Sequence, residues 1–327
     1  DTEKSKLSGV AAYREMNDVT NQLGVKGPTV ATYRKAIDVM GNTSDVDIQL
    51  LAVPGQFDPG VSDYAIDMVE SRFDALYLMD ITEKTTFDDV VTGSIAEGSG
   101  VERSPDKTLS NFKNRSINSS FVASYYPQVL MSPPDSTTQQ WQPASVAAMG
   151  AYALNDYLGN PWSAPAGYTR GLVNGTEVRK RVTNTDVQSD MYDAGINLIL
   201  QRDGQALAIW GQKTGKTGTS SLNRVNVRRL LISVRRSVKA VARTLLFEPN
   251  RASTLAKFES LVNPILQTVQ EKSGVNRFKV VIDTTTTTQA DIENNTIRGK
   301  IFLEPTRTAE YISLDFTVMN SDQFDSL

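Results

Sequence analysis

The sequence predicts an α/β and α+β multi-domain fold, in which an α/β sheet domain is followed by a carboxyl-terminal α+β domain. Apolar runs alternate with helical patterns in the first half, which favours a parallel sheet covered by helices. In the second half, a long amphipathic helical pattern and a second helix precede the strands. A chain of 327 residues also exceeds a usual single domain. The expected divisions are 1–20, a remnant of an upstream region, then 21–160 and 161–327.

In the first half, apolar runs and helical spacing locate the elements. The expected strands are Ile48–Val53, Ala75–Met79 and Phe121–Tyr126, and the expected helices are Val61–Phe73 and Ser145–Leu158. Ser145 is the expected N-cap of its helix, and Gly159 follows its end. Residues 82–118 are polar and are expected to form a long exposed loop. Residues 131–142, which contain Pro133-Pro134, are the expected linker.

In the second half, the pattern changes to helices followed by strands. Leu222–Leu246 places its apolar residues on one stripe without Gly or Pro, and Pro249 ends it. A second helix is expected at 252–272, with a kink at Pro264. The expected strands are 198–210, which turns at Asp203-Gly204, and then Phe278–Ile282, Lys300–Leu303 and the alternating Tyr311–Val318.

The absence of cysteine and histidine limits the possible chemistry. It excludes disulfides, thiolate and imidazole metal sites, and a Ser-His-Asp triad. The acids Asp186, Asp190 and Asp193 do not have the spacing of an EF-hand loop, so a helix-initiating role is expected for them. We therefore expect no catalytic residue, no metal and no cofactor. No apolar run approaches the roughly 18 residues of a membrane span, and no membrane partner is expected.

Positive charge is concentrated in one segment. Between Asp203 and Glu248 there is no acid, whereas nine bases occur: Lys213, Lys216, Arg224, Arg228, Arg229, Arg235, Arg236, Lys239 and Arg243. Five of these bases are spaced by four or seven residues and form one ridge on a helix: Arg224, Arg228, Arg235, Lys239 and Arg243. Docking on an acidic protein surface is the favoured interpretation of this ridge. A solvated or internally paired face and nucleic-acid binding remain alternatives.

The glycine-rich loop Gly211–Thr217 suggests nucleotide binding. A Walker A loop places four residues between its glycines, but here three intervene. A flexible surface loop is therefore the favoured interpretation. The alternative function is an enzyme or binding module that takes phosphorylated or nucleic-acid ligands on segment 213–243.

Short motifs, in this order, resemble the contractile tail sheath family of phages, phage-like bacteriocins and related injection machines. They are Trp162–Gly167, Ala194–Asn197, Ile209–Gly211 with Thr214, Val227–Arg229, Phe247–Asn250 and Thr308–Glu310. Upstream, Leu51–Gly55, Arg72–Leu76 and Asp80 resemble the family more loosely. Gly167 stands where the family often has Asn, and Lys213 where it usually has Arg. The polar segment 82–118 suggests a divergent member, of the kind found in large phages.

The resemblance implies a structural protein and not an enzyme. Sheath subunits polymerise around an inner tail tube and contract, which drives the tube through the host cell envelope. The implied partners are other sheath subunits, the tube protein and the baseplate, with no direct contact to nucleic acid. The implied location is the virion tail, assembled in the host cytoplasm. The ridge residues Arg224, Arg228, Arg235, Lys239 and Arg243 are candidates for facing the tube or a neighbouring subunit.

In the family, terminal arms add strands to the sheets of neighbouring subunits, and such addition supplies backbone hydrogen bonds. The strand-exchange candidates are Tyr311, Ile312, Leu314, Phe316 and Val318. Residue 1 is Asp, and Asp1–Lys6 lacks the apolar core of a signal peptide. We interpret the chain as a fragment without its native amino terminus. We therefore expect it to be monomeric by itself.

Overall fold

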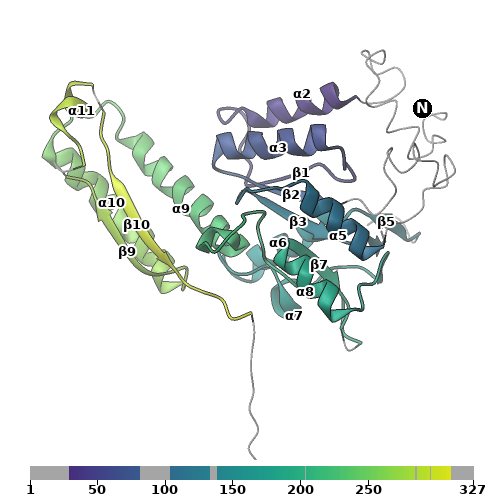
Figure 1. The fold of residues 1–327 in the computed structure, drawn as a ribbon. Helices are drawn as coiled ribbons and strands as arrows, with labels where there is room; N and C mark the ends of the chain where they lie inside the picture. The colour runs from purple at the N-terminus through teal and green to yellow at the C-terminus, as the bar shows by residue number, and fades with distance from the viewer. Residues whose placement is uncertain are drawn as a thin grey trace, which may run out of the picture.

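The computed structural model describes residues 29–81, 104–132, 138–202, 204–283, 286–294 and 296–310. These residues form a mixed α/β body from which an elongated arm extends (Figure 1). Helix α9 (Val225–Thr244) begins in the body and continues into the arm. The predicted mixed α/β fold is confirmed.

A five-stranded sheet forms the centre of the body. Its strands are β1 (Leu50–Ala52), β2 (Leu76–Asp80), β3 (Val122–Tyr126), β7 (Ile196–Leu200) and β8 (Ala208–Ile209), in the order β1-β2-β3-β7-β8. The first four run parallel, and β8 pairs antiparallel with β7. The three predicted first-half strands are therefore confirmed. The strands expected within 198–210 are also found, as β7 at the start of this range and β8 near its end. Asp203, at the expected turn, lies outside the described residues.

Helices cover both faces of the sheet. One core lies beneath α2 (Val30–Gly41), α3 (Pro59–Arg72), α5 (Pro105–Asn114) and α8 (Thr185–Asp193). The other lies beneath α6 (Ala144–Leu158) and the start of α9, with the short α7 (Gly167–Arg170) beside α6. In β2, Tyr77 and Met79 enter the first core and Leu76 and Leu78 enter the second. This alternation explains the continuous apolar run of a strand buried on both faces.

The expectation of an exposed loop at 82–118 is wrong for its carboxyl-terminal part. Helix α5 occupies Pro105–Asn114, capped by the Ser104 side chain, which accepts a hydrogen bond from the Lys107 backbone N–H at 3.3 Å. Leu109 and Phe112, spaced by three residues, bury one face of this helix in the core. Residues 82–103 lie outside the described residues.

The expected linker at 131–142 is also corrected. Strands β4 (Val129–Met131), β5 (Gln140–Gln142) and β6 (Glu177–Val178) form a small antiparallel sheet in the order β5-β4-β6. Residues 133–137 lie outside the described residues. Val129 of β4 and Val178 of β6 are buried in the body core, so this small sheet is part of the body.

The N-cap of helix α6 lies two residues earlier than expected. Pro143 occupies the N-cap position, and Ser145 is a fully buried residue of the first turn. Its side chain bonds to Asp80 and does not cap the helix. The expected N-cap role of Ser145 is therefore wrong, whereas Gly159 does end the helix.

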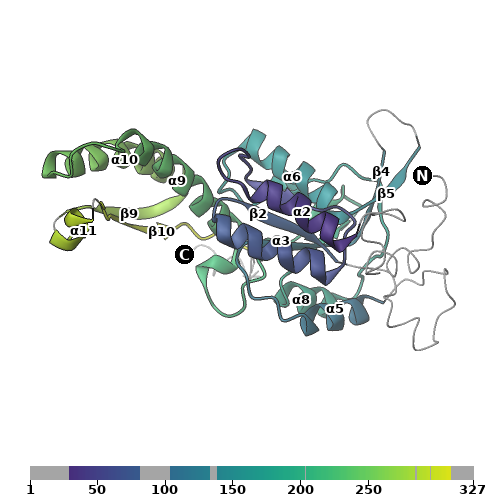
Figure 2. The same ribbon diagram turned by 90° about the horizontal axis from the view of Figure 1, so that it is seen from above.

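The arm contains most of α9, α10 (Ala252–Glu271), β9 (Val275–Val281), α11 (Gln289–Glu293) and β10 (Lys300–Pro305). The strands β9 and β10 form an antiparallel pair against which α10 packs. Leu230, Val234, Val262 and Leu266 are buried between the helices and this pair. Figure 2 shows that the arm extends to one side of the body. The predicted helices are confirmed, and Pro264 lies inside α10 without ending it.

The division expected after residue 160 does not coincide with the sheet. Strands β7 and β8 complete the sheet that β1 to β3 begin, so both sides of residue 160 contribute to one unit. The visible change of shape instead occurs along α9 (Figure 1). The expected strand Tyr311–Val318 and segment 1–20 lie outside the described residues.

Candidate functional site

Two of the five bases predicted to form a ridge on α9, Arg224 and Arg228, make their contacts within this chain. Arg228 is 8% exposed, and its guanidinium lies 3.9 Å from the ring centroid of Phe121. It also donates a hydrogen bond to the Ser120 hydroxyl. Burial lowers the pKa of Arg228 to about 10. Arg224 lies beside residues 306–310, and its Nε is 2.6 Å from a Glu310 carboxylate oxygen.

Arg229, which flanks the ridge, is also part of the core. It is 4% exposed and donates two hydrogen bonds to the Asp156 carboxylate, at 2.8 and 2.6 Å. Its guanidinium lies 4.8 Å from the ring centroid of Tyr152. The Tyr152 hydroxyl is 2.7 Å from that of Tyr125, and burial raises the pKa of Tyr152 to about 12. Because a charge is costly to remove from water, a buried guanidinium is stable only when a partner such as the Asp156 carboxylate binds it.

A stack of arginine and aromatic side chains attaches α9 to the body. Arg235 lies 4.9 Å from the ring centroid of Phe73, which meets Phe121 edge to face at 5.4 Å. Arg228 stacks on Phe121, so two bases seven residues apart on α9 each contact one ring of this pair. Arg236 adds an ion pair with Asp47. These basic residues therefore orient the helix.

Beyond these contacts, α9 carries exposed positive charge. Lys239 and Arg243 lie on the part of the helix in the arm, and both are exposed. Among the residues that the structure describes, no carboxylate forms an ion pair with either. Of the five ridge candidates, Arg224 and Arg228 are therefore engaged internally. Arg235, Lys239 and Arg243 remain accessible.

The glycine-rich loop uses its backbone donors within the chain. The N–H groups of Lys213, Thr214 and Gly215 donate to Asn197 Oδ1, Asn223 O and Val122 O, at 2.6, 3.0 and 2.9 Å. Lys216 and Thr217 donate to side-chain oxygens of Thr214 and Asn118. A phosphate-binding loop must direct such groups at its ligand. The loop connects β8 to α9 and is not built to hold a phosphate.

Glu310 joins the end of the described chain to the body. Its carboxylate accepts hydrogen bonds from the Tyr192 hydroxyl at 2.7 Å and from Gln212 Nε2 at 3.0 Å, in addition to the pair with Arg224. The Gln212 side chain also bonds to Thr308. Residues 306–310 therefore run back from β10 onto the body, as Figure 1 shows.

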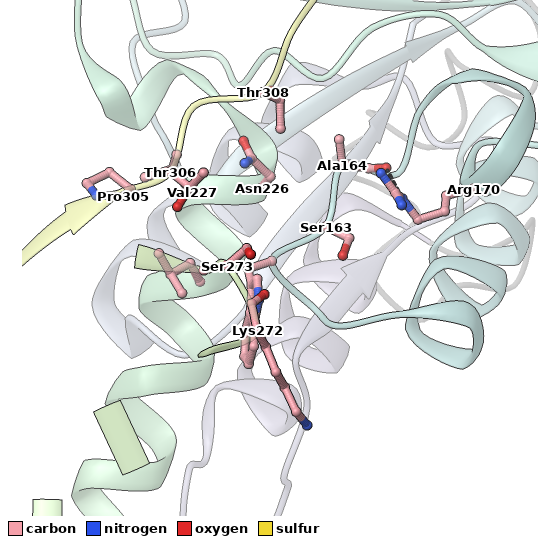
Figure 3. Close-up of a pocket in the computed structure, with 13 residues that line it drawn as sticks. Ser163, Ala164, Arg170, Asn226, Val227, Lys272, Ser273, Pro305, Thr306 and Thr308 are labelled. Atoms are coloured by element: carbon pink, nitrogen blue, oxygen red, sulfur yellow. Dashed lines mark hydrogen bonds between the residues drawn. The ribbon is translucent and has the colours of Figure 1, made fainter. Parts of the chain in front are cut away.

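A cavity of about 160 Å³ lies where the arm meets the body. Figure 3 shows side chains from separate segments around it: Ser163 and Ala164, Arg170, Asn226 and Val227, Lys272 and Ser273, and Pro305, Thr306 and Thr308. Trp162 donates from its indole nitrogen to the Lys272 carbonyl at 3.1 Å. The tryptophan-containing turn thus connects α6 to the turn between α10 and β9.

Sequence reasoning missed the partners of these bases. Asp156 precedes Arg229 by 73 residues and Asp47 precedes Arg236 by 189 residues. Neither acid lies in a motif, so no local signal identified it. The described residues contain no cluster of three or more acidic side chains able to hold a metal ion. Among the helices that the structure describes, none is long and apolar enough to span a membrane.

The sequence pattern of the phage tail sheath C-terminal domain matches residues 217–319. The chain is 31% identical to the tail sheath protein of Vibrio phage KVP40 over 186 residues, which cover 56% of this chain and 27% of that protein. It is 30% identical to the tail sheath protein of Enterobacteria phage T4 over 191 residues, 58% of this chain and 29% of that protein. The match therefore spans less than two thirds of each relative's length.

Solved structures have the same fold. The helical sheath of the anti-feeding prophage in its contracted state matches with a TM-score of 0.64 and 23% identity, over 88% of this chain and 74% of that one. The contracted sheath of an extracellular contractile injection system (PVC) matches with a TM-score of 0.66 and 23% identity, over 90% and 76%. These likenesses establish the fold of this chain. Residues 217–319 therefore match the carboxyl-terminal domain of phage tail sheaths, and more than half of the chain is similar to tail sheath proteins.

Proposed function

We propose that this chain is a subunit of a contractile sheath that surrounds an inner tail tube and contracts to drive the tube through the host cell envelope. The match of residues 217–319 to the phage tail sheath C-terminal domain carries this proposal. The contracted sheaths of the anti-feeding prophage and of the PVC system, which share the fold, support it. No step in this function requires a catalytic group, a cofactor or a metal.

The proposed partners are other sheath subunits and the baseplate. A baseplate structure of the anti-feeding prophage in its contracted state matches this chain with a TM-score of 0.69 over 88% of its length. The proposed location is the virion tail, and the proposed site of assembly is the host cytoplasm. The proposal involves no membrane and no direct contact with nucleic acid.

Strand exchange is the proposed link between subunits. In the described part of the chain, β9 and β10 pair only with each other. A two-stranded sheet has only marginal stability by itself, and its unpaired edges can accept further strands. Residues 311–318 alternate apolar and polar side chains, as a strand with one buried face does. We propose that Tyr311, Ile312, Leu314, Phe316 and Val318 add to the β9–β10 sheet of a neighbouring subunit.

The accessible bases of α9 are the proposed contact to the inner tube. Arg235, Lys239 and Arg243 lie along one side of this helix, since they are spaced by four residues. Charge complementarity predicts an acidic tube surface opposite them. Arg224 and Arg228 support this contact indirectly, because they fix the helix on the body.

Charge reversal tests the contact. The double variant K239E/R243E should bind preformed tubes of the tail tube protein more weakly in a co-sedimentation assay. The loss should be largest at low salt, since exposed charges are screened beyond about 10 Å at 0.1 M. The matched control is R277E/E304R, which exchanges the charges of an exposed ion pair between β9 and β10, away from the end of α9. Equal binding of K239E/R243E and the unmodified chain, at low salt, would contradict the proposed tube contact.

We also propose that this chain is monomeric without the tube, so that pelleting reports tube binding. Sedimentation of the chain alone is the control experiment. Tubes formed by the chain itself would overturn the monomer proposal.

A further inference from the structure

The turn between α9 and α10 exposes two apolar side chains in succession. Leu246 is 62% exposed and Phe247 is fully exposed, whereas the preceding Leu245 is buried. The turn lies at the end of the arm, beside α11 and away from the body (Figure 1). Burying a phenylalanine side chain stabilises a protein by about 1.5–3 kcal/mol. Phe247 does not gain this free energy in the isolated chain, which suggests that a partner covers it.

The backbone of Phe247 is strained. Its φ of +70° lies in the left-handed region, where helix ends favour glycine or asparagine. A side chain with a Cβ loses roughly 1–2 kcal/mol in that conformation. The sequence thus places a large aromatic residue where glycine would be more stable, which is typical of positions kept for contact with a partner.

The turn is nevertheless held firmly. Thr254 Oγ1 donates to the Pro249 carbonyl at 2.6 Å, and Asn250 Nδ2 donates to the Thr296 carbonyl at 3.2 Å. Glu248 pairs with Lys257 at 3.7 Å. These contacts fasten the turn to α10 and to the segment after α11. Phe247 is therefore presented by an ordered turn, which lowers the entropic cost of binding.

Two exposed bases flank the apolar pair in sequence. Arg243 and Arg251 stand four residues before and after Phe247, and both are exposed. Neither forms an ion pair with a carboxylate among the described residues. The one acid of the turn, Glu248, is already paired with Lys257. An apolar centre with a cationic rim fits a partner whose apolar recess is bordered by carboxylates.

We infer that Leu246 and Phe247 form the apolar centre of the contact between the arm and the inner tube, with Arg243 and Arg251 at its rim. This inference rests on the proposed function, since it assigns the same helix end to the same partner. Aromatic side chains at the centre of an interface contribute most of the binding free energy, while charges at the rim contribute mainly to the association rate. Phe247 therefore determines how long the chain stays on the tube.

Variants of Phe247 test the inference in the same co-sedimentation assay with preformed tubes. F247A should weaken binding by at least about tenfold, as expected of a central aromatic residue. F247G should weaken it equally and also raise the melting temperature, because glycine relieves the left-handed strain. The matched control is Y157A, which removes an aromatic side chain that is 86% exposed at the end of α6 in the body. Y157A should bind normally.

The outcomes separate the inference from the proposed function. If F247A and F247G bind like the unmodified chain while K239E/R243E binds weakly, the inferred role of Phe247 is wrong. The proposed tube contact through Lys239 and Arg243 is then still supported. If none of these variants loses binding, both are wrong. If F247A abolishes self-association of the chain and leaves tube binding unchanged, the partner of this turn is a second copy and the inference is overturned.

Discussion

At the residue scale, polar side chains in the motifs that resemble the sheath family form hydrogen bonds that hold the fold together. Asn197, fully buried on β7, donates to the Ser124 and Lys213 carbonyls at 3.2 and 2.8 Å. Its own oxygen accepts from the Lys213 N–H at 2.6 Å. Glu310 instead accepts hydrogen bonds from the side chains of Tyr192, Gln212 and Arg224. Buried polar groups are retained when every bond is satisfied, which explains these residues without any catalytic role.

Asp80 is the residue with the clearest dependence on pH. It is 5% exposed at the end of β2, where it accepts from the Gly55 N–H at 3.0 Å and from the N–H and hydroxyl of Ser145, both at 2.7 Å. Burial raises the pKa of Asp80, and these three hydrogen bonds oppose the rise without cancelling it. The folded chain therefore binds this proton more tightly than the unfolded chain.

The sign of the effect follows from this linkage. The contribution of Asp80 to the unfolding free energy is full below the unfolded pKa and is lost as pH rises through the raised folded pKa. The difference in unfolding free energy between the unmodified chain and D80N should therefore fall from pH 4 to pH 7. Urea denaturation at a series of pH values measures it. A difference that stays constant or grows over this range would show that Asp80 ionises freely in the fold.

At the element scale, buried strands were easier to predict than helices with few apolar residues. Residues 76–80 form a continuous buried strand, and their apolar run predicted it. Helix α5 was missed because only Leu109 and Phe112 mark its apolar face within a polar segment. The long stripe of α9 predicted a helix, but the roles of its bases depend on partners such as Asp47 and Asp156, which are distant in sequence. The spacing of the bases alone could not show that Arg228 is buried whereas Lys239 is exposed.

Trp162 is the element-scale connection between body and arm. It packs against the arm core and donates to the Lys272 carbonyl. W162A should lower the local stability of the arm by about 1–3 kcal/mol, less than for a fully buried tryptophan. Amide hydrogen exchange should accelerate in β9 and β10 but not in β2 and β3. W162F, which keeps a ring and loses the donor, should have a smaller effect. Equal acceleration in β2 would mean that Trp162 stabilises the whole fold and not this junction.

At the scale of the whole molecule, the architecture separates a covered sheet from a projecting arm. Helices bury both faces of the sheet, so the body has a hydrophobic core of its own on each face. The arm, in contrast, combines a two-stranded sheet, accessible bases and an exposed apolar turn. Composition and motifs predicted the family and excluded enzyme classes. The direction in which the arm extends depends on the packing of α9, which no local pattern specifies.

We propose that copies of this chain surround an inner tube and contact it through the arm. A helical reconstruction of the assembled sheath around its tube, by electron cryomicroscopy, tests this most directly. We expect the carboxyl-terminal part of α9 and the turn with Phe247 to face the tube, with Lys239 and Arg243 opposite carboxylates. The body should lie at larger radius. An arm that points outward, with the sheet body against the tube, would contradict the account.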